Sequence, residues 1–182
     1  MIEVSKLYEG LRQEGLSTGI PMTFVELGSG IDYTDEELLS ELIKSTKFKG
    51  EWICLLGKDT LKTGMGSFVK GLAKCLFHVE MESDGSEKDP GWFQYVDRWV
   101  VDYRPASRFN YLGLRTQDHV RFVLDNNSDI EEVKEAFGVL KNCQAVKYLK
   151  VTDASLWTIH SHELKDIVRQ QDRNRIYLAF GG

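Results

Sequence analysis

Apolar strand-like runs and amphipathic helix-like segments alternate along this chain, and the alternation restricts its fold more than any other feature. The apolar runs predict strands at residues 22–27, 51–56, 77–81, 98–103, 119–124, 145–151 and 175–180. Apolar residues that recur every three or four positions predict helices from Thr34, over 64–76, from Ser128 and over 154–171. Strands that are joined through helices need crossover connections, which are right-handed and make a sheet mostly parallel. We therefore predict an α/β fold with mostly parallel strands.

The composition is that of a single globular domain without a nucleic-acid or membrane surface. The chain has 182 residues, of which 42% are hydrophobic and 28% charged, so we expect one soluble domain over residues 1–182. The net charge of -5 and the lack of a basic stripe argue against a nucleic-acid duplex as a partner. No apolar run is long enough to span a bilayer, and the first residues do not resemble a signal peptide. With only three cysteines, the chain is expected in the reducing cytoplasm.

The cysteines are placed for packing rather than for metal binding. Cys54 lies in a predicted strand, Cys75 extends the apolar stripe of a predicted helix, and Cys143 follows another helix. No two of them form a CxxC or CxxxC pair. We predict that all three behave as small hydrophobic core residues.

The histidines also predict no metal site. His160 falls in an apolar helix stripe with Leu156, Ile159 and Leu164, which predicts a buried or half-buried side chain. His162 points to the other face, and two metal ligands on one helix face need a spacing of three or four residues. No Ser-His-Asp order, Walker loop or dinucleotide glycine pattern is present, so no catalytic residue is predicted.

Several segments resemble, in order and spacing, motifs of the 7-carboxy-7-deazaguanine synthases, a family of radical S-adenosylmethionine enzymes. They read LRQEGLSTGIPMTFVEL at 11–27, VEMESDGS at 79–86, VVDYRPAS at 100–107, NYL at 110–112 and DHVRFV at 118–123. The family has a Gln-Gly-Glu-Gly turn and a Phe-Val-Arg-Leu strand in the first segment, and Glu-Thr-Asn-Gly and Met-Asp-Tyr-Lys sequences in the next two. The resemblance implies an incomplete, TIM-like α/β barrel that is commonly dimeric.

The residues on which the family's chemistry depends are replaced in this chain. Where the family has a CxxxCxxC loop that holds a four-iron four-sulfur cluster, this chain continues as GSGIDY at 28–33. A Gly-Gly-Glu-Pro segment that contacts S-adenosylmethionine corresponds to GKDT at 57–60. The strand arginine that faces the substrate carboxylate is Glu26, and only Glu14 and Gly15 remain of the Gln-Gly-Glu-Gly turn. The resemblance therefore implies a degenerate homologue without iron–sulfur cluster or S-adenosylmethionine, because the radical mechanism needs both.

Polar residues remain at the predicted strand ends, where parallel α/β folds place their sites. The functional interpretation is a pocket for a purine- or pterin-like heterocycle, and the alternative is a set of solvated or salt-bridged remnants. Asp102 and Arg104 alternate with Tyr103, so they share one strand face and their opposite charges could pair. Arg121 is a further charged residue at a strand end. The candidate ligand-binding residues are Glu14, Gly15, Glu82, Asp84, Asp102, Arg104 and Ser107.

Two kinds of function remain open at this point. The first is a non-catalytic ligand-binding, regulatory or assembly protein, which Glu26 and the missing cysteine loop favour. The second is an enzyme of deazapurine or queuosine-precursor metabolism that acts on a related heterocycle without a cluster. Trp92, Phe93 and Tyr95 either pack a short helix between strands or contact a second subunit. Because the resembled family is commonly dimeric, we expect a homodimer.

Overall fold

The computed structural model describes residues 1–46, 51–57, 60–61, 64–126, 128–152, 154–170 and 176–180. Its contacts divide the chain into two compact units. The N-terminal unit comprises residues 1–13, 17–83 and 89–99, and the C-terminal unit comprises residues 14–16, 84–88 and 100–182. Each unit has strands and helices of its own, and the predicted single domain stays a prediction.

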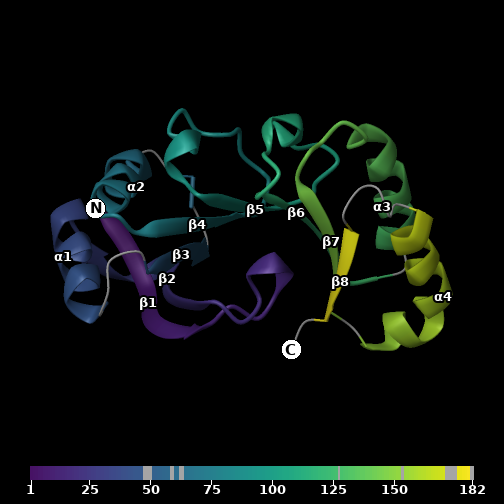
Figure 1. Ribbon diagram of the computed structural model, residues 1–182, viewed down its shortest axis with the longest axis horizontal. Helices are drawn as coiled ribbons and strands as arrows, with labels where there is room; N and C mark the ends of the chain where they lie inside the picture. Colours follow the sequence, from purple (N-terminus) through teal and green to yellow (C-terminus); the bar gives the residue numbers. More distant parts are fainter. Residues whose placement is uncertain are drawn as a thin grey trace. The chain divides into compact units, whose positions relative to one another are not determined.

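The N-terminal unit holds a mixed sheet and two helices (Figure 1). Strand β1 (Ile2–Leu11) pairs antiparallel with β2 (Pro21–Tyr33), and β2, β3 (Trp52–Gly57) and β4 (His78–Ser83) are parallel neighbours. Helices α1 (Asp35–Ser45) and α2 (Met65–Lys74) pack against each other, and η2 (Phe93–Tyr95) is a short 3-10 helix. The sequence does not predict β1, because only Ile2 and Val4 of this strand are buried and its apolar signal is weak.

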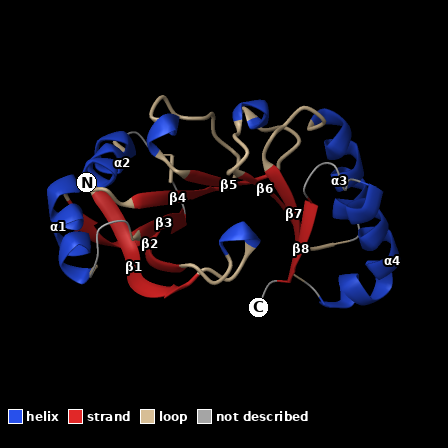
Figure 2. Ribbon diagram, in the orientation of Figure 1, coloured by secondary structure: helices blue, strands red, loops and turns tan. Residues whose placement is uncertain are grey.

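The C-terminal unit holds parallel strands that follow one another in chain order (Figure 2). Strand β5 (Arg98–Asp102) enters this unit at Val100, and β6 (His119–Leu124), β7 (Val146–Val151) and β8 (Ile176–Phe180) pair in parallel after it. Helix α3 (Ser128–Val139) connects β6 to β7, and α4 (Ala154–Gln170) connects β7 to β8. The short 3-10 helix η3 (Tyr111–Gly113) precedes β6. Among the described helices, we find none with the length and apolar character of a membrane span.

Local sequence signals account well for the start of α1. The backbone N–H of Thr34 donates to Oε2 of Glu37 at 2.8 Å, and the backbone N–H of Glu37 donates to Oγ1 of Thr34 at 3.2 Å. This capping box satisfies donors that the first helical turn leaves open. The bonds from the backbone and then the hydroxyl of Thr34 lower the pKa of Glu37, because they favour its ionised form.

The helix stripes are mostly buried as predicted, but three of the predicted stripe residues are exposed. Ile43 of α1 is 51% exposed, and Leu76, which lies beyond the last residue of α2, is 62% exposed, so both of these predictions are wrong. The confirmed stripe residues of α2 and α3 are Met65, Phe68, Val69, Leu72, Ile130, Val133 and Phe137. Ile159 is 68% exposed, so its predicted place in the apolar stripe of α4 is wrong. His160 has non-helical φ and ψ angles of -111° and 16°, and this kink interrupts the regular spacing on which the prediction rests. His160 itself is half-buried, as predicted.

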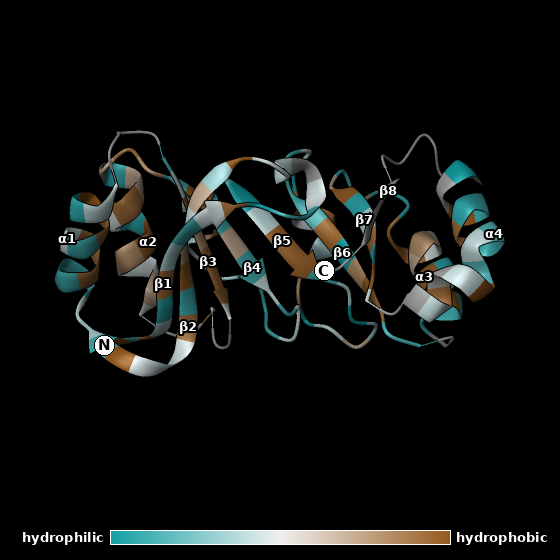
Figure 3. Cartoon of the chain, turned by 90° about the horizontal axis from the view of Figure 1, so that it is seen from below, coloured by the Kyte–Doolittle hydropathy of each residue, from teal (hydrophilic) through white to brown (hydrophobic). Residues whose placement is uncertain are grey.

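Hydrophobic and hydrophilic residues both occur along the strands of the C-terminal unit (Figure 3). Alternation along β6 puts Val120 and Phe122 on one face of the sheet and Arg121 on the other, which we call the charged face. The ring of Phe122 packs on that of Phe137 in α3, with 5.5 Å between the centroids. Successive side chains of a strand point to opposite faces, so Arg121 lies on the face turned away from α3. The register places Asp102 beside Arg121, and Arg121 beside Tyr148, on this face. The strand register therefore places the charged side chains of Asp102 and Arg121 next to each other on one face of the sheet.

Candidate functional site

The segment GSGIDY, which stands where the resembled family has its cysteine loop, belongs to a β-hairpin. Strand β2 bulges at residues 28–30 and then pairs again with β1, so that Tyr33 lies opposite Ile2. A Cβ atom added to Gly30 would lie 2.1 Å from the carbonyl oxygen of Val4, so the bulge needs glycine at this position. The segment is therefore built into the sheet through its backbone.

The thiols of Cys54 and Cys143 do not suit a four-iron four-sulfur cluster. Burial, followed by the charges of nearby carboxylates, raises the pKa of Cys54, whose thiol donates to Oε1 of Glu80 at 3.9 Å. Burial also raises the pKa of Cys143, which donates to the carbonyl oxygen of Tyr111 at 3.1 Å. Cluster ligands have to be thiolates, which these environments disfavour. Within the described part of the chain, no group of three His, Cys, Asp or Glu residues could hold a metal ion.

These contacts confirm core positions for Cys54 and Cys143, whereas Cys75 is half-buried at the end of α2. The segment GKDT at 57–60 can be placed only in part, because Lys58 and Asp59 lie outside the described residues. Gly57 has a φ of +104°, and an added Cβ atom would lie 2.3 Å from the carbonyl oxygen of Leu27. The close contact between the backbones of β2 and β3 is therefore sufficient to explain why residue 57 is a glycine.

A buried charge network surrounds Glu80 in the N-terminal unit. Glu80 is fully buried, and its carboxyl group lies 2.9 Å from Nε of Arg12 and 3.2 Å from Nη1 of Arg98. The hydroxyl of Ser17 donates to Oε2 of Glu80 at 2.7 Å. Nη1 of Arg12 also lies 2.5 Å from Oε1 of Glu82, one of the predicted ligand-binding residues. Glu82 is thus part of a compensated ion-pair network.

A second charged cluster lies on the charged face of the C-terminal sheet. Nε of Arg121 donates to Oδ1 of Asp102 at 2.5 Å, and its Nη1 lies 3.1 Å from Oε1 of Glu14. Nζ of Lys150 lies 3.3 Å from the same carboxyl group. The structure thus brings the predicted residues Asp102 and Glu14 together through Arg121. The expected pair with Arg104 is replaced: Asp102 pairs with Arg121, and Arg104 pairs with Asp84.

The predicted residues Asp84, Arg104 and Ser107 hold a loop of the C-terminal unit together. Nε of Arg104 donates to the carbonyl oxygen of Asp84 at 2.5 Å, and the hydroxyl of Ser107 donates to the carbonyl oxygen of Gly85. Although burial raises the pKa of Asp84, hydrogen bonds from Ser86 outweigh it and leave the pKa below its usual value. These side chains bind the protein's own backbone. This structural role is a sufficient reason for the chain to contain residues that resemble the family's motifs at these positions.

Tyr111 fixes the same loop from the other side. Its hydroxyl donates to the carbonyl oxygen of Asp102 at 2.8 Å and accepts from the backbone N–H of Arg104 at 3.0 Å. Gly85 has a φ of +70°, and an added Cβ atom would lie 2.1 Å from the carbonyl oxygen of Asp102. The backbone at the carboxyl end of β5 therefore leaves no room for a side chain at Gly85.

Gly15 packs against buried polar side chains in the C-terminal unit. It has a φ of +72°, and an added Cβ atom would lie 3.1 Å from Nδ1 of His119. His119 is 1% exposed and makes an edge contact with the ring of Tyr148 at 5.8 Å between centroids. Gly15 thus places the neighbouring Glu14 beside the sheet.

The residues that sequence reasoning missed are Arg12, Glu80, Arg98, His119 and Lys150. The available signal was a charged residue between two apolar neighbours in a strand, as at Glu80 and Lys150. Such residues are rarely buried unless they are paired.

The aromatic residues near η2 pack within the N-terminal unit. The ring of Phe93 stacks on that of Trp99 at 5.0 Å between centroids, and Trp92 lies 5.8 Å from Trp99. A Cβ atom added to Gly66 of α2 would lie 2.5 Å from the ring of Trp92. These contacts support the packing interpretation, whereas the predicted subunit contact stays a prediction.

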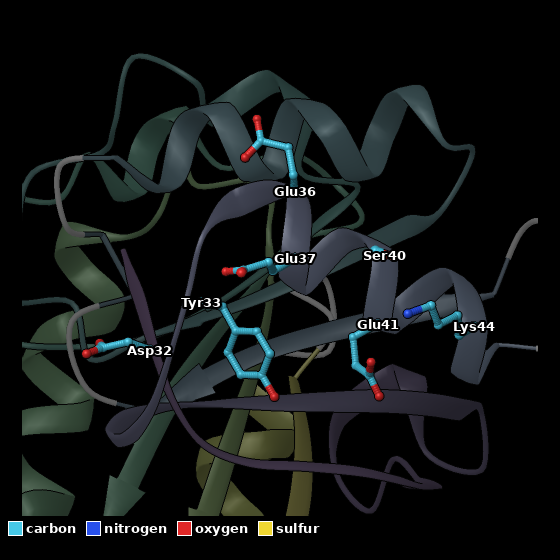
Figure 4. A pocket seen from close by; sticks show the side chains of 7 residues that line it. All are labelled: Asp32, Tyr33, Glu36, Glu37, Ser40, Glu41 and Lys44. Carbon is cyan, nitrogen blue, oxygen red and sulfur yellow. The ribbon is translucent and has the colours of Figure 1, made fainter.

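A surface pocket of about 450 Å³ lies along α1 (Figure 4). Its side chains are mostly acidic, and Glu37 among them is engaged in the capping box with Thr34. None of the predicted ligand-binding residues lines it. The lining residues are Asp32, Tyr33, Glu36, Glu37, Ser40, Glu41 and Lys44.

Comparison with known proteins identifies the fold. Neither the protein-family models nor the curated proteins include a match to this sequence. The crystal structure of QueE from Escherichia coli is similar over 99% of this chain and 93% of that chain, with a TM-score of 0.71 and 12% sequence identity. This similarity confirms the predicted fold class, an incomplete α/β barrel with mostly parallel strands. At this identity the likeness concerns the fold alone.

Replacing Glu80 with glutamine tests the buried network. The substitution Glu80→Gln leaves the guanidinium groups of Arg12 and Arg98 beside a neutral amide. We expect the free energy of unfolding to fall by about 3–5 kcal/mol, the usual cost of removing one member of a buried ion pair. Urea unfolding measures it, with the exposed Glu9→Gln as a control that should change stability by about 0.5 kcal/mol or less. Equal effects of the two substitutions would contradict a stabilising role for Glu80.

Replacing Gly85 with alanine tests the loop contact. Gly19 also has a positive φ, of +85°, but an added Cβ atom there meets nothing within 4 Å. Gly19→Ala should therefore cost only the conformational penalty of about 1–2 kcal/mol. We expect Gly85→Ala to cost about 1–3 kcal/mol more in urea unfolding, because its Cβ atom also overlaps a backbone oxygen. A loss no larger than that of Gly19→Ala would show that the loop can relax.

Proposed function

We propose that this protein is a catalytically degenerate homologue of 7-carboxy-7-deazaguanine synthase with a ligand-binding, regulatory or assembly role. The chain shares the fold of QueE, which is a 7-carboxy-7-deazaguanine synthase and a radical S-adenosylmethionine enzyme. The sequence motifs of this chain resemble the same family. The observation that carries the proposal is the β1–β2 hairpin. The backbone that would have to open into a cluster-binding loop is engaged in strand pairing and a glycine bulge.

The charges around Glu26, in the middle of β2, support a change of ligand. Burial, and then the charges of Glu26, Cys54 and Glu82, raise the pKa of Tyr8. Glu26 is half-buried in β2, where the resembled family has an arginine that faces a carboxylate. A carboxylate placed beside Glu26 would be repelled, since like charges in contact cost several kcal/mol. We propose that this face of the N-terminal unit does not receive the family's carboxylate.

The retained polar residues of the C-terminal unit support a small-molecule ligand, for which we propose a purine- or pterin-like heterocycle. The charged cluster of Asp102, Arg121, Glu14 and Lys150 lies on one sheet face. A homodimer and a cytoplasmic location complete the proposal. The alternative, an enzyme that acts on the same heterocycle without a cluster, would draw on this same cluster of side chains.

The absence of radical chemistry can be tested directly. After anaerobic reconstitution with iron and sulfide, we expect a colourless protein with no stable iron, because Cys54 and Cys143 are buried and no two cysteines have the spacing of a cluster motif. The visible spectrum and the iron content measure it, with a cysteine-loop synthase treated in parallel as the positive control. About four irons per chain and micromolar binding of S-adenosylmethionine by calorimetry would refute the proposal.

The ligand can be sought by a thermal-shift screen of purines, pterins and deazapurines. A ligand at a hundredfold excess over its dissociation constant stabilises the folded state by about 2.7 kcal/mol. We expect Asp102→Asn and Lys150→Met to abolish the shift, because both side chains belong to this charged cluster, whereas His160→Ala in α4 should keep it. A hit that survives both substitutions, or that is lost in His160→Ala, would place the site elsewhere.

A further inference from the structure

Glu14 lies between two cationic side chains of the C-terminal unit. Its Oε1 atom lies 3.1 Å from Nη1 of Arg121 and 3.3 Å from Nζ of Lys150, and its Oε2 atom lies 3.3 Å from the same Nζ. The three side chains are 15%, 10% and 26% exposed, so water screens these contacts only in part. Arg and Lys hold a carboxylate ligand with this same arrangement of donors.

The two cations are fixed by the sheet, whereas Glu14 is not. Arg121 lies in register between Asp102 of β5 and Tyr148 of β7. Lys150 follows two residues after Tyr148 and therefore lies on the same face of β7. Glu14 comes from residues 14–16, which lie outside the strands. Displacement of its side chain therefore needs no change in the pairing of β5, β6 and β7.

We propose that Arg121 and Lys150 form a binding site for the carboxylate group of a small-molecule ligand, and that Glu14 occupies this site until the ligand displaces it. The inference deepens the proposed function, on which it rests for the existence of a ligand. In this arrangement Glu14 acts as a competitor built into the chain. The apparent affinity for the ligand is lowered by the fraction of molecules in which Glu14 covers the cations.

The charges of the cluster favour a carboxylate over other ligand groups. When Glu14 leaves, Arg121 and Lys150 lose one negative charge from their surroundings, while Arg121 keeps its contact with Asp102. A carboxylate restores the charge that Glu14 supplied. A phosphate dianion would place a second negative charge near Asp102, and a cation would meet two like charges. The site therefore matches a monoanion.

Acetate serves as the probe, because it reproduces the group that Glu14 supplies. Thermal unfolding of Glu14→Ala is followed in increasing sodium acetate, with sodium chloride lowered to hold the ionic strength constant. We expect acetate to bind Glu14→Ala at least tenfold more tightly than the unsubstituted protein, because the competitor is gone. At a tenfold excess over the dissociation constant, the melting temperature should rise by about 3–6 °C.

The controls separate a site from a general salt effect. Adding Lys150→Met to Glu14→Ala should abolish the response. The matched control is Glu163→Ala, which removes a carboxyl group that pairs with Lys134 and His160 but is 36% exposed. Acetate should not raise its melting temperature, because water competes for these cations. If Glu14→Ala does not fold, Glu14→Gln is measured in its place.

The outcomes are distinct. An equal response of Glu14→Ala and the unsubstituted protein overturns the site, and tighter binding of inorganic phosphate than of acetate overturns the assignment to a carboxylate. The iron content after reconstitution decides the proposed loss of radical chemistry separately, since Glu14 contributes nothing to that measurement.

Discussion

The pairing of buried charges is the constraint on which the internal structure of each unit depends. A fully buried carboxyl group such as that of Glu80 would be very costly without partners, and Arg12, Arg98 and Ser17 supply them. The hydroxyl of Ser17 comes from 63 positions away in the chain. The network therefore fixes the loop that contains Arg12 and Ser17 against β4. In the C-terminal unit, Asp102 and Arg121 play the same part between neighbouring strands.

The sequence predicts the regular elements well, because local periodicity determines them. The capping box at Thr34 and the buried stripes of α2 and α3 depend on residues a few positions apart. Strand β1 was missed because it is an exposed strand whose pairing with β2 involves no periodic apolar signal. The stripe of α4 was misread at Ile159 because a backbone kink at His160 has no local sequence signature.

The candidate site was predictable only in its residue types. Glu14 and Asp102 could be singled out as polar residues at strand ends, but the partner of each could not. Glu14 meets Arg121 over 107 positions and Lys150 over 136 positions, and no local pattern predicts contacts of this range. The register of β6 and β7 explains only why Arg121 and Lys150 share one face of the sheet. Arg104 and Ser107, in the shared motif around Gly85, bind backbone carbonyl groups, and their ligand contacts stay a prediction. A motif can therefore be maintained by the needs of the backbone as well as by a ligand.

The close backbone approaches at Gly30, Gly57 and Gly85 have a consequence for how such a chain can change over time. At each of them a main-chain oxygen occupies the space that a side chain would need. These contacts are made by main-chain atoms. They therefore do not depend on the chemistry of the neighbouring side chains. Substitutions among the polar side chains around these three positions can therefore accumulate while the backbone contacts hold the strands and the loop in place. Replacement of the glycines themselves is the change that these contacts do not tolerate.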